Sequence, residues 1–139
     1  MSETVQIKTP WLASKDPEVP STLNYSTLSM CGRVEEMVRQ YPNYIAYEFM
    51  GKTTTYAEMW QKINACAKSL KAIGIREGDK VTICMPNAPQ TLCMFYAVNM
   101  VGAIANMVHP LSAESEISFY LRDSNSVAAI TLDQFYPKV

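Results

Sequence analysis

The feature that most constrains the fold is the alternation of short apolar runs and longer segments between Gly78 and Thr131. The short runs, rich in β-branched residues, are Val81 to Met85, Ile104 to Val108 and Val127 to Thr131. Each intervening segment is long enough to form a helix. Parallel strands need crossover connections of that length, so the pattern predicts a parallel βαβαβ sheet in an α/β fold.

Helices are expected to flank these strands. Ala88 to Val101 is apolar nearly all round, which predicts a helix buried between the sheet and another layer, with Asn87 as its cap and Pro89 in its first turn. Ser112 is a candidate cap for the following helix. The buried side of that helix is predicted to hold Ile117, Tyr120 and Leu121.

The segment before the sheet predicts a helix, a hairpin and a second helix. Ser29 to Tyr41 has one-faced helical periodicity, and Tyr44 to Phe49 and Thr53 to Tyr56 flank a Met-Gly-Lys turn. Thr55 and Glu58 match a capping box. The second helix is predicted to close at Gly74 and to bury one face, formed by Met59, Ile63, Cys66, Ala67, Leu70 and Ile73.

Residues 1–28 contain Pro10, Pro17 and Pro20 with apolar residues between them. Three prolines predict extended backbone without a helix. We therefore divide the chain into an extended arm lying on a surface, residues 1–28, and an α/β portion, residues 29–139. A disordered tail is an alternative for residues 1–10.

The composition argues against several partners. The formal net charge is −1 and the cationic residues are scattered, so no nucleic acid is expected to bind. The four cysteines include no Cys-x-x-Cys pair, and the single histidine lies at no zinc-like spacing from them. With no apolar block near the N-terminus, these features predict a reduced, cytoplasmic protein without a structural metal.

The segment from Leu92 to Val108 has the hydropathy of a membrane span. It is shorter than the roughly 20 residues that a bilayer requires, and it contains Asn99, Asn106 and Gly102. A helix and a strand buried in an α/β sheet have the same hydropathy. We therefore expect no transmembrane segment here.

Two side chains follow predicted strands, at the edge where parallel sheets bind ligands. His109 is a candidate base or ligand contact, but we favour the alternative of an imidazole bonded to nearby backbone and held rigid by Pro110. Asn87 is a candidate ligand contact that a helix cap also explains. No glycine lies in a phosphate-binding motif and no Ser/His/Asp set is visible, so we assign no catalytic, cofactor-binding or metal residue.

Three blocks of residues occur in a characteristic order: Thr55-Tyr56-x-Glu58, Gly74 to Val81 with Met85-Pro86-Asn87, and Gly102-Ala103 followed by His109-Pro110-Leu111. They resemble the N-terminal region of the AMP-forming adenylate ligases, which include acyl-CoA synthetases, luciferases and adenylation domains of peptide synthetases. The resemblance extends from about Ser29 to Phe135. It is greatest to medium- and long-chain fatty-acid–CoA ligases, which commonly have Asn where this chain has His109.

The resemblance implies an incomplete first subdomain of the adenylate-forming ligase fold. In the complete enzyme, a fatty acid would attack the α-phosphorus of ATP with the help of Mg2+, and the CoA thiol would then displace AMP from the acyl-adenylate. The family's Ser/Thr/Gly-rich phosphate loop and its other ATP-handling motifs would lie beyond Val139. The resemblance therefore implies an N-terminal fragment that is inactive alone, with ATP, Mg2+ and CoA as cofactors of the full-length enzyme only.

An alternative function is a stand-alone, non-catalytic α/β binding or interaction module. An incomplete sheet leaves an edge and an apolar face uncovered, and such surfaces recruit partners or second copies. A homo-oligomer formed through the uncovered sheet surface is therefore a further expectation.

Overall fold

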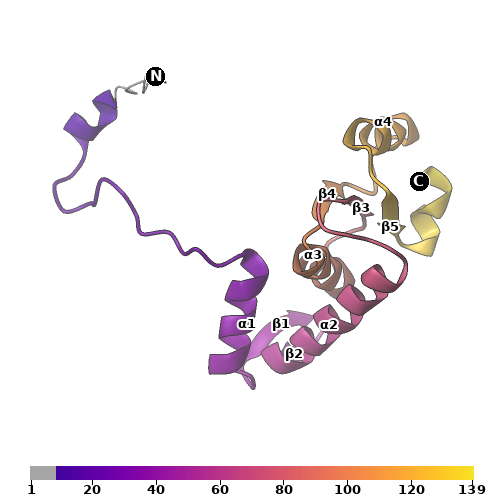
Figure 1. Cartoon of the computed structure of the whole chain (residues 1–139), viewed down its shortest axis with the longest axis horizontal. Coiled ribbons are helices and arrows are strands. Elements are labelled where there is room, and N and C mark those ends of the chain that lie inside the picture. Colours follow the sequence, from indigo (N-terminus) through magenta and orange to yellow (C-terminus); the bar gives the residue numbers. More distant parts are fainter. Residues whose placement is uncertain (1–8) are drawn as a thin grey trace.

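Helices and strands follow the predicted order in the computed structural model, which describes residues 9–139 (Figure 1). The helices are α1 (Met30–Gln40), α2 (Tyr56–Ala72), α3 (Pro89–Val101) and α4 (Glu114–Ser124). The strands are β1 (Ile45–Phe49), β2 (Lys52–Thr55), β3 (Lys80–Cys84), β4 (Ile104–Val108) and β5 (Ala128–Thr131). Two 3-10 helices, η1 (Pro10–Ser14) and η2 (Asp133–Lys138), lie near the two ends.

The strand β3 is the centre of a three-stranded parallel sheet with the order β4-β3-β5. At its carboxyl end, Cys84 pairs with Val108 of β4 and with Thr131 of β5. The parallel βαβαβ unit is thus confirmed. The strand order shows in addition that the second crossover returns past β3 to its other side.

Different helices cover the two faces of the sheet. Ile83 packs in one core with Leu70 of α2 and Val98 of α3. Cys84, the next residue, packs in a second core with Ile117 of α4. Successive side chains of a strand face opposite sides, so β3 is buried from both directions. Figure 1 shows α3 between α2 and the sheet, as predicted, and α4 on the opposite side.

The predicted hairpin is confirmed, but Lys52 belongs to β2 rather than to the turn, and Tyr56 is the first residue of α2 rather than the end of the strand. Met50 and Gly51 have φ values of 51° and 77°, the combination of a type I′ turn, whose twist matches that of the two strands. The backbone N–H of Thr55 donates to Oε2 of Glu58 at 2.8 Å, and the N–H of Glu58 donates to Oγ1 of Thr55 at 3.3 Å. These reciprocal bonds form the predicted capping box.

Glycines in the left-handed region end both α2 and α3. Gly74, the predicted end of α2, has a φ of 95°, and Gly102 has a φ of 83°. The N–H of the residue after each glycine donates to the carbonyl five residues earlier, at 3.1 Å in both helices. This is the hydrogen bonding of a Schellman motif, which satisfies a carbonyl in the last turn.

The prediction that Asn87 caps α3 is wrong. Because α3 begins at Pro89, its cap position falls on Ala88, and no side chain bonds to the helix N-terminus there. Pro89 lies in the first turn as predicted, where its missing N–H has no intrahelical role. Asn87 therefore lies one residue outside the cap and is exposed. The hydroxyl of Thr91 instead fastens this loop by donating to the carbonyl of Pro86 at 2.6 Å.

The prediction that Ser112 caps α4 is also wrong. The cap position is Ala113, and its backbone N–H donates to the Glu116 carboxylate at 3.0 Å. Alanine has no side-chain acceptor, so only this half of a capping box can form. Glu114 and Glu116 both lie in the first turn, where the helix dipole favours negative charge.

Two residues assigned to buried helix faces are exposed. Ile73 is 72% exposed because α2 ends at Ala72 and Ile73 occupies the cap position, where the helical periodicity stops. Tyr120 is 40% exposed because α4 meets the sheet through the core that contains Ile117, with Leu121 packed against that core. Ile117 and Leu121 therefore fulfil the prediction and Tyr120 does not.

The arm differs from its prediction in two respects. Pro10–Ser14 forms the 3-10 helix η1, because a proline is compatible with the first turn of a helix. None of the described arm residues is buried, and Figure 1 shows the arm running away from the other elements. The arm therefore does not lie on a surface of residues 29–139. The rest of the predicted tail, residues 1–8, lies outside the described residues.

Candidate functional site

The two residues singled out from the sequence lie at the same edge of the sheet. Asn87 follows β3 and His109 follows β4, and these strands end side by side with Cys84 paired to Val108. Both side chains are exposed. The structure thus brings the two candidates to the predicted edge, on adjacent loops.

The imidazole of His109 is held by its own loop. Its Nδ1 accepts a hydrogen bond from the backbone N–H of Leu111 at 3.2 Å, and the intervening Pro110 is almost fully buried. This is the backbone-bonded imidazole that the sequence suggested as the alternative to a ligand contact. An acceptor bond at Nδ1 places the ring proton on Nε2 in the neutral form.

The loop between β3 and α3 is not built to bind the phosphates of a nucleoside triphosphate. Phosphate loops present several backbone N–H groups at a helix N-terminus, but Pro86 and Pro89 each lack one. The hydroxyl of Thr91 is already bonded to the Pro86 carbonyl. No group of three His, Cys, Asp or Glu side chains within residues 9–139 could hold a metal ion. The loop after β3 therefore lacks the array of amide donors that a phosphate loop provides.

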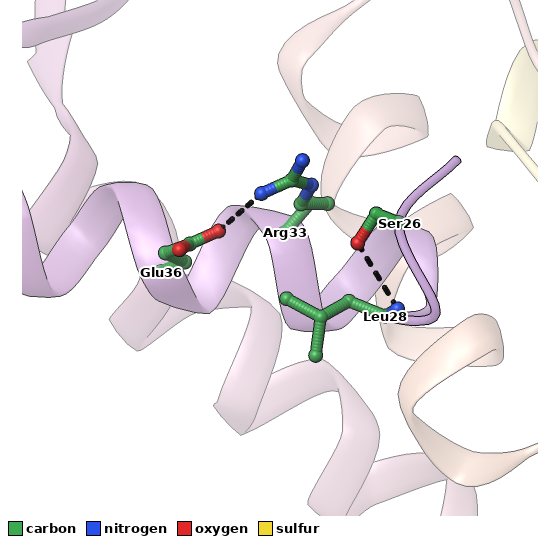
Figure 2. A network of polar contacts seen from close by, with 4 residues as sticks. All are labelled: Ser26, Leu28, Arg33 and Glu36. Atoms are coloured by element: carbon green, nitrogen blue, oxygen red, sulfur yellow. Dashed lines mark hydrogen bonds and ion pairs between the residues drawn. The ribbon is translucent and has the colours of Figure 1, made fainter. Parts of the chain in front are cut away.

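The start of α1, where the arm joins it, has local partners for its polar groups. Figure 2 shows the Ser26 hydroxyl accepting from the Leu28 N–H, at 3.1 Å, and the Arg33 guanidinium paired with Glu36, at 2.5 Å. Ser29 caps the helix by accepting from the Gly32 N–H at 3.0 Å. Because the guanidinium faces a carboxylate and the cap is occupied, we do not assign an anion site here.

A strip of polar side chains crosses the face of the sheet that α4 covers. Oγ1 of Thr82, fully buried in β3, accepts from the Asn106 side chain at 2.9 Å and lies 2.7 Å from the Ser126 hydroxyl. Ser126 is bonded in turn to Ser124 at 2.8 Å. No buried side-chain nitrogen or oxygen among the described residues lacks a hydrogen-bond partner, so the role of the strip is to position the chain after α4.

A pocket of ≈ 300 Å³ opens between β1, α2 and the first turns of α3. It is lined by Tyr47, Lys62, Cys66, Pro89, Gln90, Cys93 and Met94. Nζ of Lys62 donates to the Tyr47 hydroxyl at 3.3 Å and lies 5.8 Å from the centre of that ring. One cation and three sulfur-containing side chains therefore share this small space.

The two thiols of this pocket are not activated nucleophiles. Burial raises the pKa of both Cys66 and Cys93. For Cys93, a negative charge on Cys66 raises the pKa further, whereas the Lys62 ammonium lowers it. Both thiols are therefore protonated at neutral pH. The sequence placed Cys66 on the buried face of its helix, and nothing local to either cysteine indicates that Cys66 and Cys93 line one pocket.

Comparison with known proteins relates the chain to one family. The family model described as "AMP-binding enzyme" matches residues 34–138. A long-chain-fatty-acid–CoA ligase of Bacillus subtilis is 31% identical over 134 residues, which is 96% of this chain and 24% of that protein. The long-chain-fatty-acid–CoA ligase FadD13 of Mycobacterium tuberculosis is 42% identical over 76 residues, 55% of this chain and 15% of that protein.

Solved structures agree with these sequence matches. The N-terminal domain of FACL13 from Mycobacterium tuberculosis superposes with a TM-score of 0.72 at 34% identity, covering 76% of this chain and 27% of that one. The N-terminal subdomain of NpsA from Klebsiella oxytoca has the same fold, with a TM-score of 0.72 at 24% identity over 75% of this chain and 27% of its own. The chain thus spans about a quarter of the length of these proteins.

Proposed function

This chain belongs to the AMP-binding enzyme family, and from that premise we propose that it is the N-terminal portion of an ATP-dependent fatty-acid–CoA ligase. The observation that carries the proposal is the combined match to a long-chain-fatty-acid–CoA ligase over 96% of the chain and to the fold of a FACL13 N-terminal domain. In such an enzyme the substrate is a fatty acid, activated as an acyl-adenylate and transferred to CoA.

The proposed contribution of this portion is a scaffold. A parallel sheet whose central strand is buried on both faces holds loops at its carboxyl edge in fixed positions, and the loops after β3 and β4 are held internally, by Thr91 and by His109. Because the loop after β3 lacks the amide donors of a phosphate loop, we derive no step of the reaction from these residues. We propose instead that the phosphate-binding, magnesium-binding and CoA-binding residues belong to other parts of the full-length enzyme.

The ligase proposal is tested on the longer protein whose reading frame contains these residues. We expect carboxylate-dependent exchange of pyrophosphate into ATP, and formation of a thioester when CoA is added. Hexadecanoate and octanoate serve as substrates, with a reaction lacking any carboxylate as the control. Absence of exchange with every carboxylate tried, from a protein that is folded and carries the whole family domain, would reject the ligase assignment.

The 139-residue chain alone is proposed to be inactive. We expect calorimetric titration with ATP and Mg2+ to give no saturable heat at micromolar concentrations, because no phosphate cradle lies at the edge of the sheet. Stoichiometric binding with a micromolar dissociation constant would contradict this proposal.

The alternative function, a non-catalytic interaction module, rests on surfaces that the chain leaves open. Ile104 and Met107 on the edge strand β4 are 53% and 49% exposed, and Val127 beside β5 is 60% exposed. Such edges favour self-association, so we propose a homo-oligomer through the sheet surface. A light-scattering mass that stays monomeric at high concentration would count against it.

Cytoplasmic location and the absence of a nucleic-acid partner also remain proposals. They rest on the net charge of −1 and on the unpaired, reduced state of the cysteines. Among the helices of residues 9–139, none combines the length and the apolar composition needed to cross a bilayer.

A further inference from the structure

The apolar pocket beside the start of α3 has a cation at its mouth. The pocket, of ≈ 300 Å³, lies between β1, α2 and α3, and its apolar lining comes from Cys66, Pro89, Cys93 and Met94. Cys93 is only 3% exposed, and Cys66 and Met94 are half-buried. Small-molecule sites range from about 300 to 1,000 Å³. The pocket therefore has room for a small apolar group.

The cation is the Lys62 ammonium, an exposed group that Tyr47 of β1 holds in place. Its Nζ donates to the Tyr47 hydroxyl at 3.3 Å and lies 5.8 Å from the centre of that ring, close enough for a cation–π contact. A phenol that accepts a hydrogen bond can still donate its own proton. Two donors, one of them charged, therefore lie 3.3 Å apart in the lining of an apolar pocket.

Lys62 has no carboxylate partner within residues 9–139. Glu58, four positions earlier on α2, has the spacing of a helical ion pair, but its carboxylate accepts from the backbone N–H of Thr55 at 2.8 Å and from the Thr55 hydroxyl at 3.1 Å. These hydrogen bonds lower the pKa of Glu58 most, and the Lys62 charge lowers it to a smaller extent. Both ion pairs of the described residues lie on α1. The ammonium is thus available to an anionic ligand.

We propose that this pocket binds a medium-chain monocarboxylic acid, with its alkyl chain against Cys93 and Met94 and its carboxylate on Lys62 and Tyr47. The carboxylate would accept one hydrogen bond from the ammonium and one from the phenol, and hydrogen bonds between charged groups are the stronger kind. The head group stays at the boundary with solvent, so binding buries no unpaired charge. The alkyl chain leaves water for the apolar lining, which supplies the driving force.

The charges around the mouth favour a single negative charge on the ligand. A second, more polar pocket shares Lys62 with the first and is also lined by Lys52 and Glu58. Two lysines and one glutamate give this region a net charge of +1. A carboxylate neutralises that charge, whereas a phosphate monoester, with about −1.5 to −2 at neutral pH, would leave an excess of negative charge.

The experiment is calorimetric titration of the 139-residue chain at neutral pH with butanoate, hexanoate, octanoate and decanoate. We expect saturable binding of one molecule per chain. Each methylene that enters the pocket should tighten binding by about fourfold, which corresponds to about 0.8 kcal/mol, until the pocket is filled. Octanol, which has the same chain without the charge, should bind roughly fivefold more weakly than octanoate.

Two variants separate the head-group contact from the chain contact. Lys62→Met removes the ammonium and keeps an unbranched stem, so it should weaken octanoate binding by roughly fivefold and leave octanol binding unchanged. Met94→Gln places an amide against the alkyl chain and should weaken both ligands by at least about fivefold. Lys68→Met is the matched control, since Lys68 is also an exposed lysine of α2 but lines neither pocket. It should bind octanoate as the wild type does, and circular dichroism verifies the fold of each variant.

Three results would overturn the proposal: no saturable octanoate binding by the folded chain, equal affinities for octanoate and octanol, or a folded Lys62→Met variant that binds octanoate as tightly as the wild type. An equal loss in Lys68→Met would also reject the site, because binding would then follow net charge alone. The proposal does not rest on the ligase assignment. The titration requires neither ATP nor CoA, so its failure and the absence of pyrophosphate exchange in the longer protein are separate outcomes.

Discussion

Replacing Gly102 by alanine should destabilise the chain more than the same change at Gly74, although each glycine follows a helix with a similar φ of 83° or 95°. An alanine in the left-handed region costs roughly 1–2 kcal/mol. Alanine also lowers the conformational entropy of the unfolded chain, which offsets about 0.4–1 kcal/mol of this cost. A new Cβ at Gly74 would meet nothing within 4 Å, so we expect Gly74→Ala to cost about 1 kcal/mol.

At Gly102 the new Cβ would also meet Glu77. Its distances to Cγ and Cβ of Glu77 would be 3.1 Å and 3.3 Å. The two segments cannot separate freely, because the N–H of Gly78 donates to the carbonyl of Gly102 at 2.9 Å. Relieving such overpacking costs about 1–3 kcal/mol. We therefore expect a total cost of roughly 2–4 kcal/mol for Gly102→Ala.

The measurement is urea unfolding followed by circular dichroism, with the free energies of unfolding compared at equal slope against denaturant. Glu77→Ala removes Cγ and keeps Cβ, so a double-mutant cycle should recover part of the cost at Gly102 and none at Gly74. Equal costs for Gly102→Ala and Gly74→Ala would refute the argument, because crowding against Glu77 would then contribute nothing.

Three further predictions concern the capping box, the central strand and the polar strip. Thr55→Ala removes the hydroxyl that caps α2 and should lower the free energy of unfolding by about 1 kcal/mol. The backbone and side-chain hydrogen bonds from Thr55 lower the pKa of Glu58. These hydrogen bonds therefore stabilise the folded chain at pH values above the ordinary pKa of a glutamate carboxyl. The stabilisation is lost as the pH falls through the lowered pKa of Glu58. Unfolding measured across this range should show a weaker dependence on pH in Thr55→Ala, and an identical dependence would contradict this reading. Ile83→Ala, at a fully buried position, should cost about 2–5 kcal/mol in urea unfolding. Ile104→Ala, at a 53% exposed position, should cost under about 1 kcal/mol, and similar costs for the two would show that β3 is not the core strand. Thr82→Val leaves Asn106 without its acceptor and should cost about 1–3 kcal/mol. Thr53→Val on the exposed face of the hairpin serves as the control, and a thermal midpoint for Thr82→Val as high as that of the control would show that the strip contributes no stability.

Local sequence features predicted most of the elements because their causes are local. The positive φ values at Met50-Gly51, the capping box at Thr55 and the left-handed glycine at Gly74 each depend on a few adjacent residues. The failures lie at element boundaries. Asn87 lies one residue before the cap position, because α3 begins at Pro89 and its cap is therefore Ala88. Ile73 fitted the helical period, but the helix had already ended.

The candidate sites were predictable from the sequence only in part. The position of His109 at the carboxyl edge, and its bond to nearby backbone, could be anticipated, because both follow from its place directly after a strand. The pocket with Cys66 and Cys93 could not, since those residues lie on different helices and neither position carries a local signal. The polar strip was missed for the same reason. Thr82 and Asn106 appear as isolated polar residues in apolar runs and become partners only through strand register.

The sequence alone determined that this chain forms a parallel α/β unit and that it resembles one family of ligases, because periodicity and motif spacing are properties of the linear chain. The tertiary structure decided the strand order β4-β3-β5, the assignment of α3 and α4 to opposite faces, and the presence of two cysteines and a lysine in the lining of one pocket. The physical reason is that the burial of a side chain depends on how helices and strands pack against one another, and not on the sequence of a single element. A side chain's partners depend on which faces pack together, and segments distant in the chain supply those faces.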